Sequence, residues 1–365
     1  DVLGSRGLGD VYKRQVHSTK VDADIKGDLP TVDKKVQVDG TGKDATDAKI
    51  GDTLTFTLTS TIPDMSAYDT YTFNFKDTLS KGLTFGQVKS VKVENVTLTE
   101  NTDYTVTTPT ASNNNTLTVA MKDFKTKQQA NAGKKITVTY TATLNENAVV
   151  GGAGNVNSAK IQYSNNPSTN GTGESEPSKV RVFTYGFTVD KYTGDQYTDA
   201  ATRLAGAEFT LAHKDGSAIS FVQVSAGSAT ANAVYRVAKA GETGTTTITT
   251  PANGKVVFEG LKNGEYTLTE TEAPAGYNKL ASAIGVKVNG QNNGTDTTNA
   301  TVTITYNNDN GNDYNQTASN GVIPVQNKSG AILPGTGGMG TIAFTVIGVL
   351  VIALGVAWTL KRKNA

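Results

Sequence analysis

The sequence contains no cysteine and only two histidines, His17 and His213. The absence of cysteine excludes disulfides, thiol nucleophiles and cysteine-ligated zinc sites, and the scarcity of histidine removes most imidazole-based catalysis. Charge is balanced as well, with 34 Lys and Arg against 33 Asp and Glu, so the chain carries no basic field that would attract nucleic acid. We therefore expect no metal site, no cofactor and no nucleic-acid partner.

Proline is also scarce, with 9 residues in a chain of 365. Threonine, valine and asparagine recur in runs that alternate apolar and polar residues, a pattern that favours many short strands over helices. A polar stretch rich in proline, glycine and serine, residues 165–179, separates two such regions. The sequence predicts an all-β protein with one domain over residues 29–167, a linker over 168–179 and a second domain over 180–330.

The first 15 residues do not enter the fold prediction. Residues 10–15, with the sequence DVYKRQ, resemble a translated sequencing adapter, so we exclude residues 1–15 from fold reasoning. The beginning of the chain also shows no apolar segment of the kind that a signal peptide has. We expect the native N-terminus to be missing and the natural protein to be longer.

The other end of the chain has a different composition. Residues 341–360 are uncharged and mostly apolar, and a helix of that length can cross the ~30 Å hydrocarbon core of a membrane. The basic residues 361–363 follow at once, and such charges stay on the cytoplasmic side. A buried core helix is the alternative, but the segment is unpatterned. We expect a C-terminal transmembrane helix with the rest of the chain outside the cell.

Polar residues stand in apolar registers of several predicted strands. Because residues two apart on a strand share a face, these polar side chains should point into the core. In the first domain they are Lys34 with Val32 and Val36, Asp77 with Phe73 and Phe75, and Asn157 with Ala159 and Ile161. In the second they are Lys191 with Phe187 and Val189, Glu270 with Tyr266 and Leu268, and Asn327 with Ile323 and Val325.

One such lysine alone would more simply lean into solvent at the end of its strand. The same order of lysine, acid and asparagine in both domains instead favours two buried clusters. Burying an unpaired charge is costly, so the members of each cluster should be paired or bonded to one another. Lys35, next to Lys34, faces the other way and should be solvated.

Several motifs resemble those of Gram-positive pilins. Residues 266–277, YTLTETEAPAGY, resemble the E-box (YxLxETxAPxGY) of CnaB-type domains, and residues 204–209, LAGAEF, resemble their LAGAxF strand. Residues 29–167 resemble a fimbrial D2 domain through the segments 30–34, 77–83 and 157–159. The resemblance implies two tandem immunoglobulin-like β-sandwich domains of CnaA/CnaB type.

In such domains a lysine and an asparagine side chain join in a spontaneous isopeptide bond. The resemblance implies a bond from Lys34 to Asn157 with Asp77 as catalyst, and one from Lys191 to Asn327 with Glu270 as catalyst. An apolar site lowers the pKa of a lysine and raises that of a carboxyl group, which gives a neutral nucleophile beside a protonated acid. Each domain reacts once, so this is self-modification and the protein is not expected to be an enzyme.

The tail resembles a cell-wall sorting signal. Its motif is LPXTG, with Leu333, Pro334, Gly335, Thr336 and Gly337 in the five positions, followed by the apolar span and the basic tail. The resemblance implies that a sortase cuts between Thr336 and Gly337, removes the span, and passes the Thr336 carbonyl to an amine. The implied partners are a pilus-type sortase, a housekeeping sortase, neighbouring subunits and peptidoglycan.

In pilus shafts the accepting amine belongs to a lysine that usually ends a YPK sequence just before the D2 domain. Lys20 stands in that place, although neither Tyr nor Pro precedes it, and Lys26 is the second candidate. We interpret residues 16–28 as the remnant of this motif and a linker; the alternative is that Lys20 is an ordinary linker lysine.

These features predict a structural shaft subunit of a covalently polymerised surface pilus anchored to the cell wall. The alternative is a wall-anchored adhesin or minor basal pilin that is not polymerised and whose β domains are stalks. In that case a binding domain for a host surface ligand would lie outside this sequence.

Overall fold

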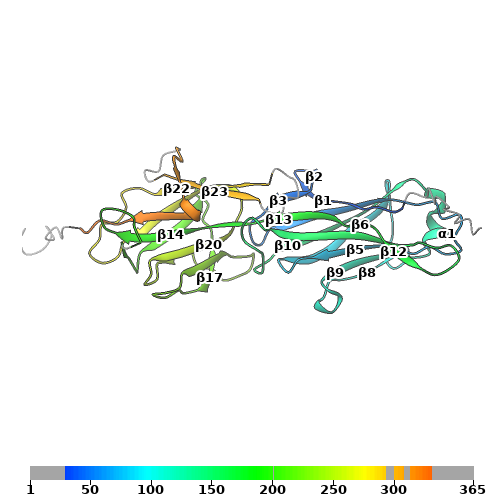
Figure 1. Ribbon diagram of the computed structural model, residues 1–365, viewed down its shortest axis with the longest axis horizontal. Helices are drawn as coiled ribbons and strands as arrows, with labels where there is room; N and C mark the ends of the chain where they lie inside the picture. Colours follow the sequence, from blue (N-terminus) through cyan, green and yellow to red (C-terminus); the bar gives the residue numbers. More distant parts are fainter. Residues whose placement is uncertain (1–28, 200, 293–299, 308–312, 331–365) are drawn as a thin grey trace, which may run out of the picture.

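The computed structural model describes residues 29–199, 201–292, 300–307 and 313–330. These residues form four β-sheets, two in each half of an elongated molecule (Figure 1). The prediction of an all-β protein is confirmed. In the described part of the chain, no helix is long and apolar enough to cross a membrane; the predicted span over residues 341–360 lies outside that part.

The first sheet supplies one face of the first sandwich. Its strands β4 and β10 each alternate threonine with buried apolar residues, among them Phe56, Leu58, Ile136 and Val138. Side chains on one face of a strand repeat every two residues, so this alternation turns one face of the sheet inward. In spatial order the strands are β2 (Thr41–Lys43), β1 (Asp33–Val38), β4 (Thr53–Thr61), β10 (Lys135–Leu144), β6 (Leu83–Val93) and β7 (Val96–Thr97).

The second sheet covers the other side of that core. Its order is β3 (Ala45–Asp47), β13 (Ser178–Phe183), β11 (Asn155–Ser164), β5 (Phe73–Leu79), β9 (Thr116–Met121) and β8 (Tyr104–Thr107), and β12 (Thr172–Glu174) also pairs with β11. The short helix α1 (Phe124–Gln128) lies between β9 and β10 with the 3-10 turns η1 (Ala111–Asn113) and η2 (Gln129–Asn131) nearby in sequence. Phe124 of α1 stacks on Phe73, which closes this end of the core.

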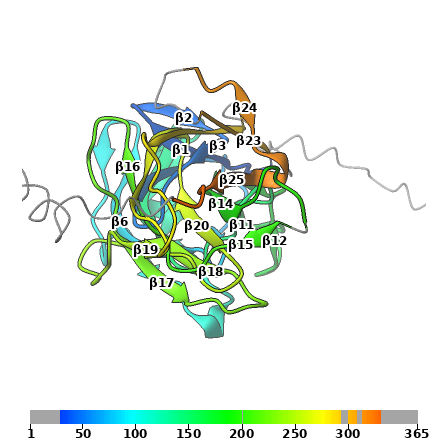
Figure 2. The same cartoon turned by 90° about the vertical axis from the view of Figure 1, so that its left-hand side faces the viewer.

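The second half of the molecule repeats the two-sheet arrangement. The third sheet has the order β15 (Thr202–Arg203), β14 (Tyr185–Thr193), β20 (Lys255–Leu261), β18 (Ala233–Val237) and β17 (Phe221–Ser225), with β25 (Val322–Gln326) beside β14 (Figure 2). The fourth has the order β19 (Ile248–Thr249), β16 (Glu208–His213), β21 (Gly264–Glu272), β22 (Ile284–Gln291), β23 (Thr301–Tyr306) and β24 (Gln316–Thr317). The 3-10 turn η3 (Ser319–Gly321) leads into β25.

The boundary between the halves differs from the expected linker at residues 168–179. Within that stretch β12 pairs with β11, and β13 continues the second sheet as far as Phe183. Val180 and Val182 are buried in the first core, so residues 180–182 belong to the first sandwich, while Phe183 at the end of β13 packs in the second core. The polar composition of residues 168–179 reflects exposed faces and loops, while the valines that follow, Val180 and Val182, point into the core from the other face of β13.

The two sandwiches meet without a flexible connection. Only Thr184 separates β13 from β14, and its buried hydroxyl donates to the Leu261 carbonyl at 3.0 Å. Across the junction, the Asn263 amide donates to Asp47 Oδ2 at 2.7 Å. Gly260 has a φ of +83°, and a Cβ there would come within 2.7 Å of Ile50. Polar contacts and close packing therefore fix the two halves end to end.

Candidate cross-linking sites

Three of the predicted site residues come together in the core of the first sandwich. Lys34 extends inward from β1 in the first sheet, and Asp77 and Asn157 extend inward from β5 and β11 in the second. On the paired strands Asp77 lies opposite Ala159, so Asn157 is two positions away on the same face. All three side chains are fully buried. The cluster thus bridges the two sheets.

Tyr140 of β10 completes this first cluster. Lys34 Nζ forms an ion pair with Asp77 Oδ2 and lies 2.9 Å from the Tyr140 hydroxyl. That hydroxyl donates to Asp77 Oδ2 at 2.6 Å and accepts a hydrogen bond from Asn157 Nδ2 at 2.6 Å. Sequence reasoning did not include Tyr140. Tyr140 shares a strand face with the buried Ile136 and Val138, so the alternation of the strand places it in the core. A core tyrosine needs a hydrogen-bond partner for its hydroxyl, and this requirement indicates a polar group nearby.

Burial changes the acid–base behaviour of this site. Desolvation lowers the pKa of Lys34 to about 8, and the neighbouring Asp77 opposes that shift without cancelling it. Desolvation also raises the pKa of Tyr140 well above its ordinary value, with the charge of Asp77 as the second cause. Lys34 is therefore deprotonated far more readily than an exposed lysine, and Tyr140 keeps its proton.

The second cluster lies in the second sandwich. β14 and β25 run parallel, with Lys191 opposite Val325, and Asn327 follows directly after the end of β25, two residues past Val325. Glu270 reaches in from β21 of the facing sheet. All three are buried, with exposed fractions of 0% for Lys191, 2% for Glu270 and 1% for Asn327. Here the lysine lies on β14 and the asparagine directly follows β25, its neighbour in the same sheet, while the acid lies across the core.

Glu270 contacts both partners in this cluster directly. Lys191 Nζ lies 3.0 Å from Glu270 Oε1, and Asn327 Nδ2 donates to Glu270 Oε2 at 3.0 Å. Asn327 Nδ2 also donates to the Asn278 carbonyl, and the Leu280 amide donates to Glu270. Desolvation lowers the pKa of Lys191 to about 8, against the opposing effect of Glu270.

Each cluster leaves buried polar atoms without hydrogen bonds. The carbonyl oxygens Asn157 Oδ1 and Asn327 Oδ1 are both in this state, as is Asp77 Oδ1. Buried polar atoms are normally satisfied, and each exception points to strain or chemistry. A lysine amine with a lowered pKa, a carboxyl group and an unsatisfied amide carbonyl are the components of acyl transfer from asparagine to lysine.

The neighbouring Lys35 provides the contrast. Its side chain is 32% exposed and pairs with Asp33 and Asp44 at the surface. These partners raise its pKa, the hydrogen bond to Asp44 being the main cause. The alternation of the strand therefore separates a buried amine from a solvated one at adjacent positions.

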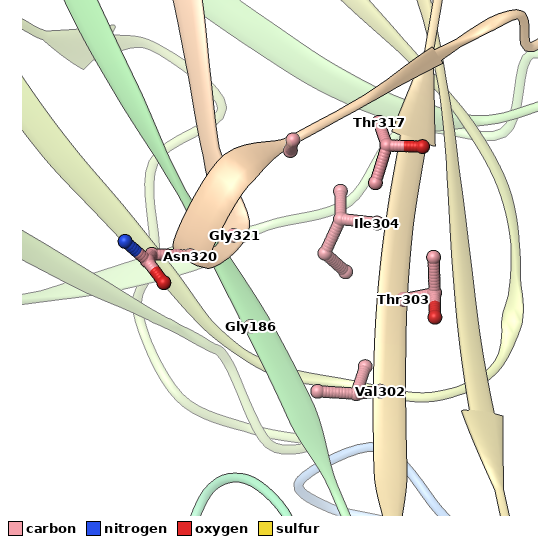
Figure 3. Close-up of a pocket in the computed structure, with 8 residues that line it drawn as sticks. Gly186, Val302, Thr303, Ile304, Thr317, Asn320 and Gly321 are labelled. Atoms are coloured by element: carbon pink, nitrogen blue, oxygen red, sulfur yellow. The ribbon is translucent and has the colours of Figure 1, made fainter.

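The described residues offer little else that resembles a reaction site. A pocket of about 460 Å³ lies between β14, β23 and η3, as Figure 3 shows. Its lining contains no titratable side chain and comes from Gly186, Val302–Ile304, Thr317, Ala318, Asn320 and Gly321. In the described ranges, no group of three or more His, Cys, Asp or Glu side chains is placed to hold a metal ion. Lys20, Lys26, the motif from Leu333 to Gly337 and the predicted span lie outside the described residues.

Comparisons with protein families match three separate segments of the chain. Residues 50–167 match the Gram-positive pilin backbone subunit 2, Cna-B-like domain. Residues 195–302 match a prealbumin-like fold domain, and residues 325–365 match the LPXTG cell wall anchor motif.

Comparisons with individual proteins give distant likenesses to pilins. The chain is 25% identical over 279 residues to the trypsin-resistant surface T6 protein of Streptococcus pyogenes serotype M6, and that alignment covers 69% of this chain and 44% of that protein. The chain thus spans less than half the length of this relative.

Among solved structures, the fold resembles a 35 kDa C-terminal fragment of the major pilin GBS80 of Streptococcus agalactiae, with a TM-score of 0.59, 24% identity, and coverage of 82% of this chain and 100% of that one. It also resembles BcpA, the major pilin subunit of Bacillus cereus, with a TM-score of 0.52, 22% identity, and coverage of 83% and 71%. At these identities the likeness concerns the fold.

Proposed function

We propose that this chain, a member of the Gram-positive pilin backbone family by its domains and its wall-anchor motif, is the repeating shaft subunit of a covalently polymerised surface pilus. The observation that carries the proposal is the presence, in both sandwiches, of a buried lysine, acid and asparagine that connect an early strand to a late one. In a subunit under tension, bonds at those positions add most to the resistance against mechanical unfolding. The wall-anchor motif places the protein at the Gram-positive cell surface.

In each domain the neutral lysine amine attacks the side-chain carbonyl carbon of the asparagine. A new amide bond forms, the bond from that carbon to Nδ2 breaks, and ammonia leaves. The products are a Lys34–Asn157 bond and a Lys191–Asn327 bond. Asp77 and Glu270 move the proton from the attacking nitrogen toward the leaving one. Each site reacts once and is then consumed, so the protein acts as a structural component and not as an enzyme with turnover.

Between subunits, we propose that a pilus-type sortase transfers the Thr336 carbonyl to Lys20 of the next copy. A housekeeping sortase then attaches the completed shaft to peptidoglycan. The absence of cysteine suits a chain whose permanent links are amides rather than disulfides.

Incubation of the purified chain with a pilus-type sortase tests the polymerisation. We expect a ladder of oligomers that resist SDS, its loss in the Lys20→Ala variant, and its persistence in the matched Lys26→Ala variant. The absence of a ladder from the unsubstituted chain would reject the shaft and favour a wall-anchored stalk. The intact mass of the same preparation reports the internal bonds separately, because each one removes the mass of one ammonia.

A further inference from the structure

The two clusters differ in how the acid reaches the asparagine. In the second sandwich, Glu270 touches both the lysine nitrogen and Nδ2 of Asn327. In the first sandwich the acid is an aspartate, one methylene shorter, and among the described contacts it makes no direct hydrogen bond to Asn157. The Tyr140 hydroxyl fills that gap, with 2.6 Å to Asp77 Oδ2 on one side and 2.6 Å to Asn157 Nδ2 on the other.

We propose that Tyr140 is a catalytic residue of the first site, which relays a proton between Asp77 and the departing nitrogen of Asn157. This inference rests on the proposed Lys34–Asn157 bond. Its hydroxyl contacts both reacting side chains, since Lys34 Nζ lies 2.9 Å from the same oxygen. A hydroxyl can accept one proton while it donates another, so it transfers a proton without ever becoming a charged phenolate.

The proton path balances. When Lys34 Nζ bonds to the Asn157 side-chain carbon, Nδ2 loses its conjugation with the carbonyl and becomes basic. Tyr140 gives its proton to Nδ2 and takes one from Asp77, and Asp77 takes a proton from the Lys34 nitrogen. The bond from carbon to Nδ2 then breaks, ammonia leaves, and Asp77 and Tyr140 return to their starting states.

Packing around Tyr140 allows the hydroxyl to be removed without removing the ring. The ring stacks on Phe56 with 5.4 Å between centroids and contacts Phe85 from another direction. A Tyr140→Phe variant keeps both contacts and loses only the hydroxyl. Tyr163→Phe is the matched control, because Tyr163 is a core tyrosine on the same strand as Asn157 but outside the cluster.

The experiment follows bond formation in the full chain after cell-free synthesis, by intact mass and by mass spectrometry of the cross-linked peptides. Positioned proton transfer accelerates reactions by about 10²- to 10⁴-fold, so Tyr140→Phe should slow the Lys34–Asn157 bond by about 100-fold or more. The Lys191–Asn327 bond of the same molecules should form at the wild-type rate and serves as an internal clock. Tyr163→Phe should leave both rates unchanged.

A second variant separates proton relay from packing. Asp77→Glu added to Tyr140→Phe supplies a carboxyl group as long as that of Glu270, and we expect it to restore part of the lost rate. Equal rates for Tyr140→Phe and wild type would overturn the relay, and so would a double variant no faster than Tyr140→Phe. A wild-type chain with no Lys34–Asn157 bond would instead reject the proposed bond itself, together with this inference.

Discussion

Replacement of Asn327 by alanine isolates the mechanical and thermodynamic value of one internal bond. The variant has no acyl donor, so the bond from Lys191 cannot form. The ion pair between Lys191 and Glu270, 3.0 Å apart, stays in place, so no unpaired charge is left in the core. Truncation of Glu270 would be a poorer test, because it leaves the buried lysine alone.

The expected loss comes from the closed loop. A link from Lys191 to Asn327 closes a loop of about 136 residues, which the chain-entropy account of cross-links values at about 5 kcal/mol. The hydrogen bonds of Asn327 Nδ2 do not add to this loss, because that nitrogen leaves as ammonia when the bond forms in wild type. For a domain of this size each kcal/mol shifts Tm by about 2–4 °C, so the second domain should melt about 10–20 °C lower.

Scanning calorimetry of the full chain measures this shift, and intact mass confirms that one ammonia fewer has been lost. Asn263→Ala is the control in the same domain, because it truncates an asparagine that donates two side-chain hydrogen bonds, to Asp47 and to the Gly290 carbonyl, and has no lysine partner. If both variants lower Tm by the same amount, loop closure contributes nothing and the reasoning is refuted.

Two further predictions concern the first domain in an Asn157→Ala variant, which keeps the amine of Lys34. Burial lowers the pKa of this lysine from 10.5 to about 8, so between these values the unfolded chain binds more protons than the folded one. The free energy of unfolding, measured with urea, should therefore rise by at most about 3 kcal/mol as the pH goes from about 8 to about 10.5. A pH profile as flat as that of the bonded wild type would contradict this prediction. In single-molecule pulling, unfolding of the first domain in the same variant should add about 120 residues, or about 400 Å, of contour length that the bond keeps from extending in wild type. Equal contour lengths in the two proteins would refute the bond.

The inward registers of the site residues could be inferred because they depend on a local rule. Alternation along a strand places Lys34 between Val32 and Val36, and all three side chains are buried. The same rule separates Lys34 from the partly exposed Lys35. Which strands lie opposite one another is a separate matter, since it depends on pairings between residues far apart in sequence.

Tyr140 and β13 were missed for that reason. A tyrosine in an apolar register is ordinary core, and its contact with Lys34 arises only because β1 and β10 flank the same strand, β4. The polar residues before Val180 predict the start of a second domain there. The pairing of Val180 with Asn157 of β11 places β13 in the second sheet, which belongs to the first sandwich.

The strand order of the first domain also determines where a pulled subunit would carry its load. With both proposed bonds formed, tension that enters before Lys34 crosses to Asn157, follows the backbone to Lys191, and crosses again to Asn327. The loaded backbone contains β11 and β13, antiparallel neighbours in which Asn157 lies opposite Val180. Tension on the adjoining ends of such a pair breaks its hydrogen bonds one at a time. The pair resists force less well in this direction of loading than in others. The pairing of β13 with β3 on its other edge, and its direct passage through Thr184 into β14, oppose that peeling. The resistance of the subunit to force should therefore depend on this edge of the second sheet more than on either core.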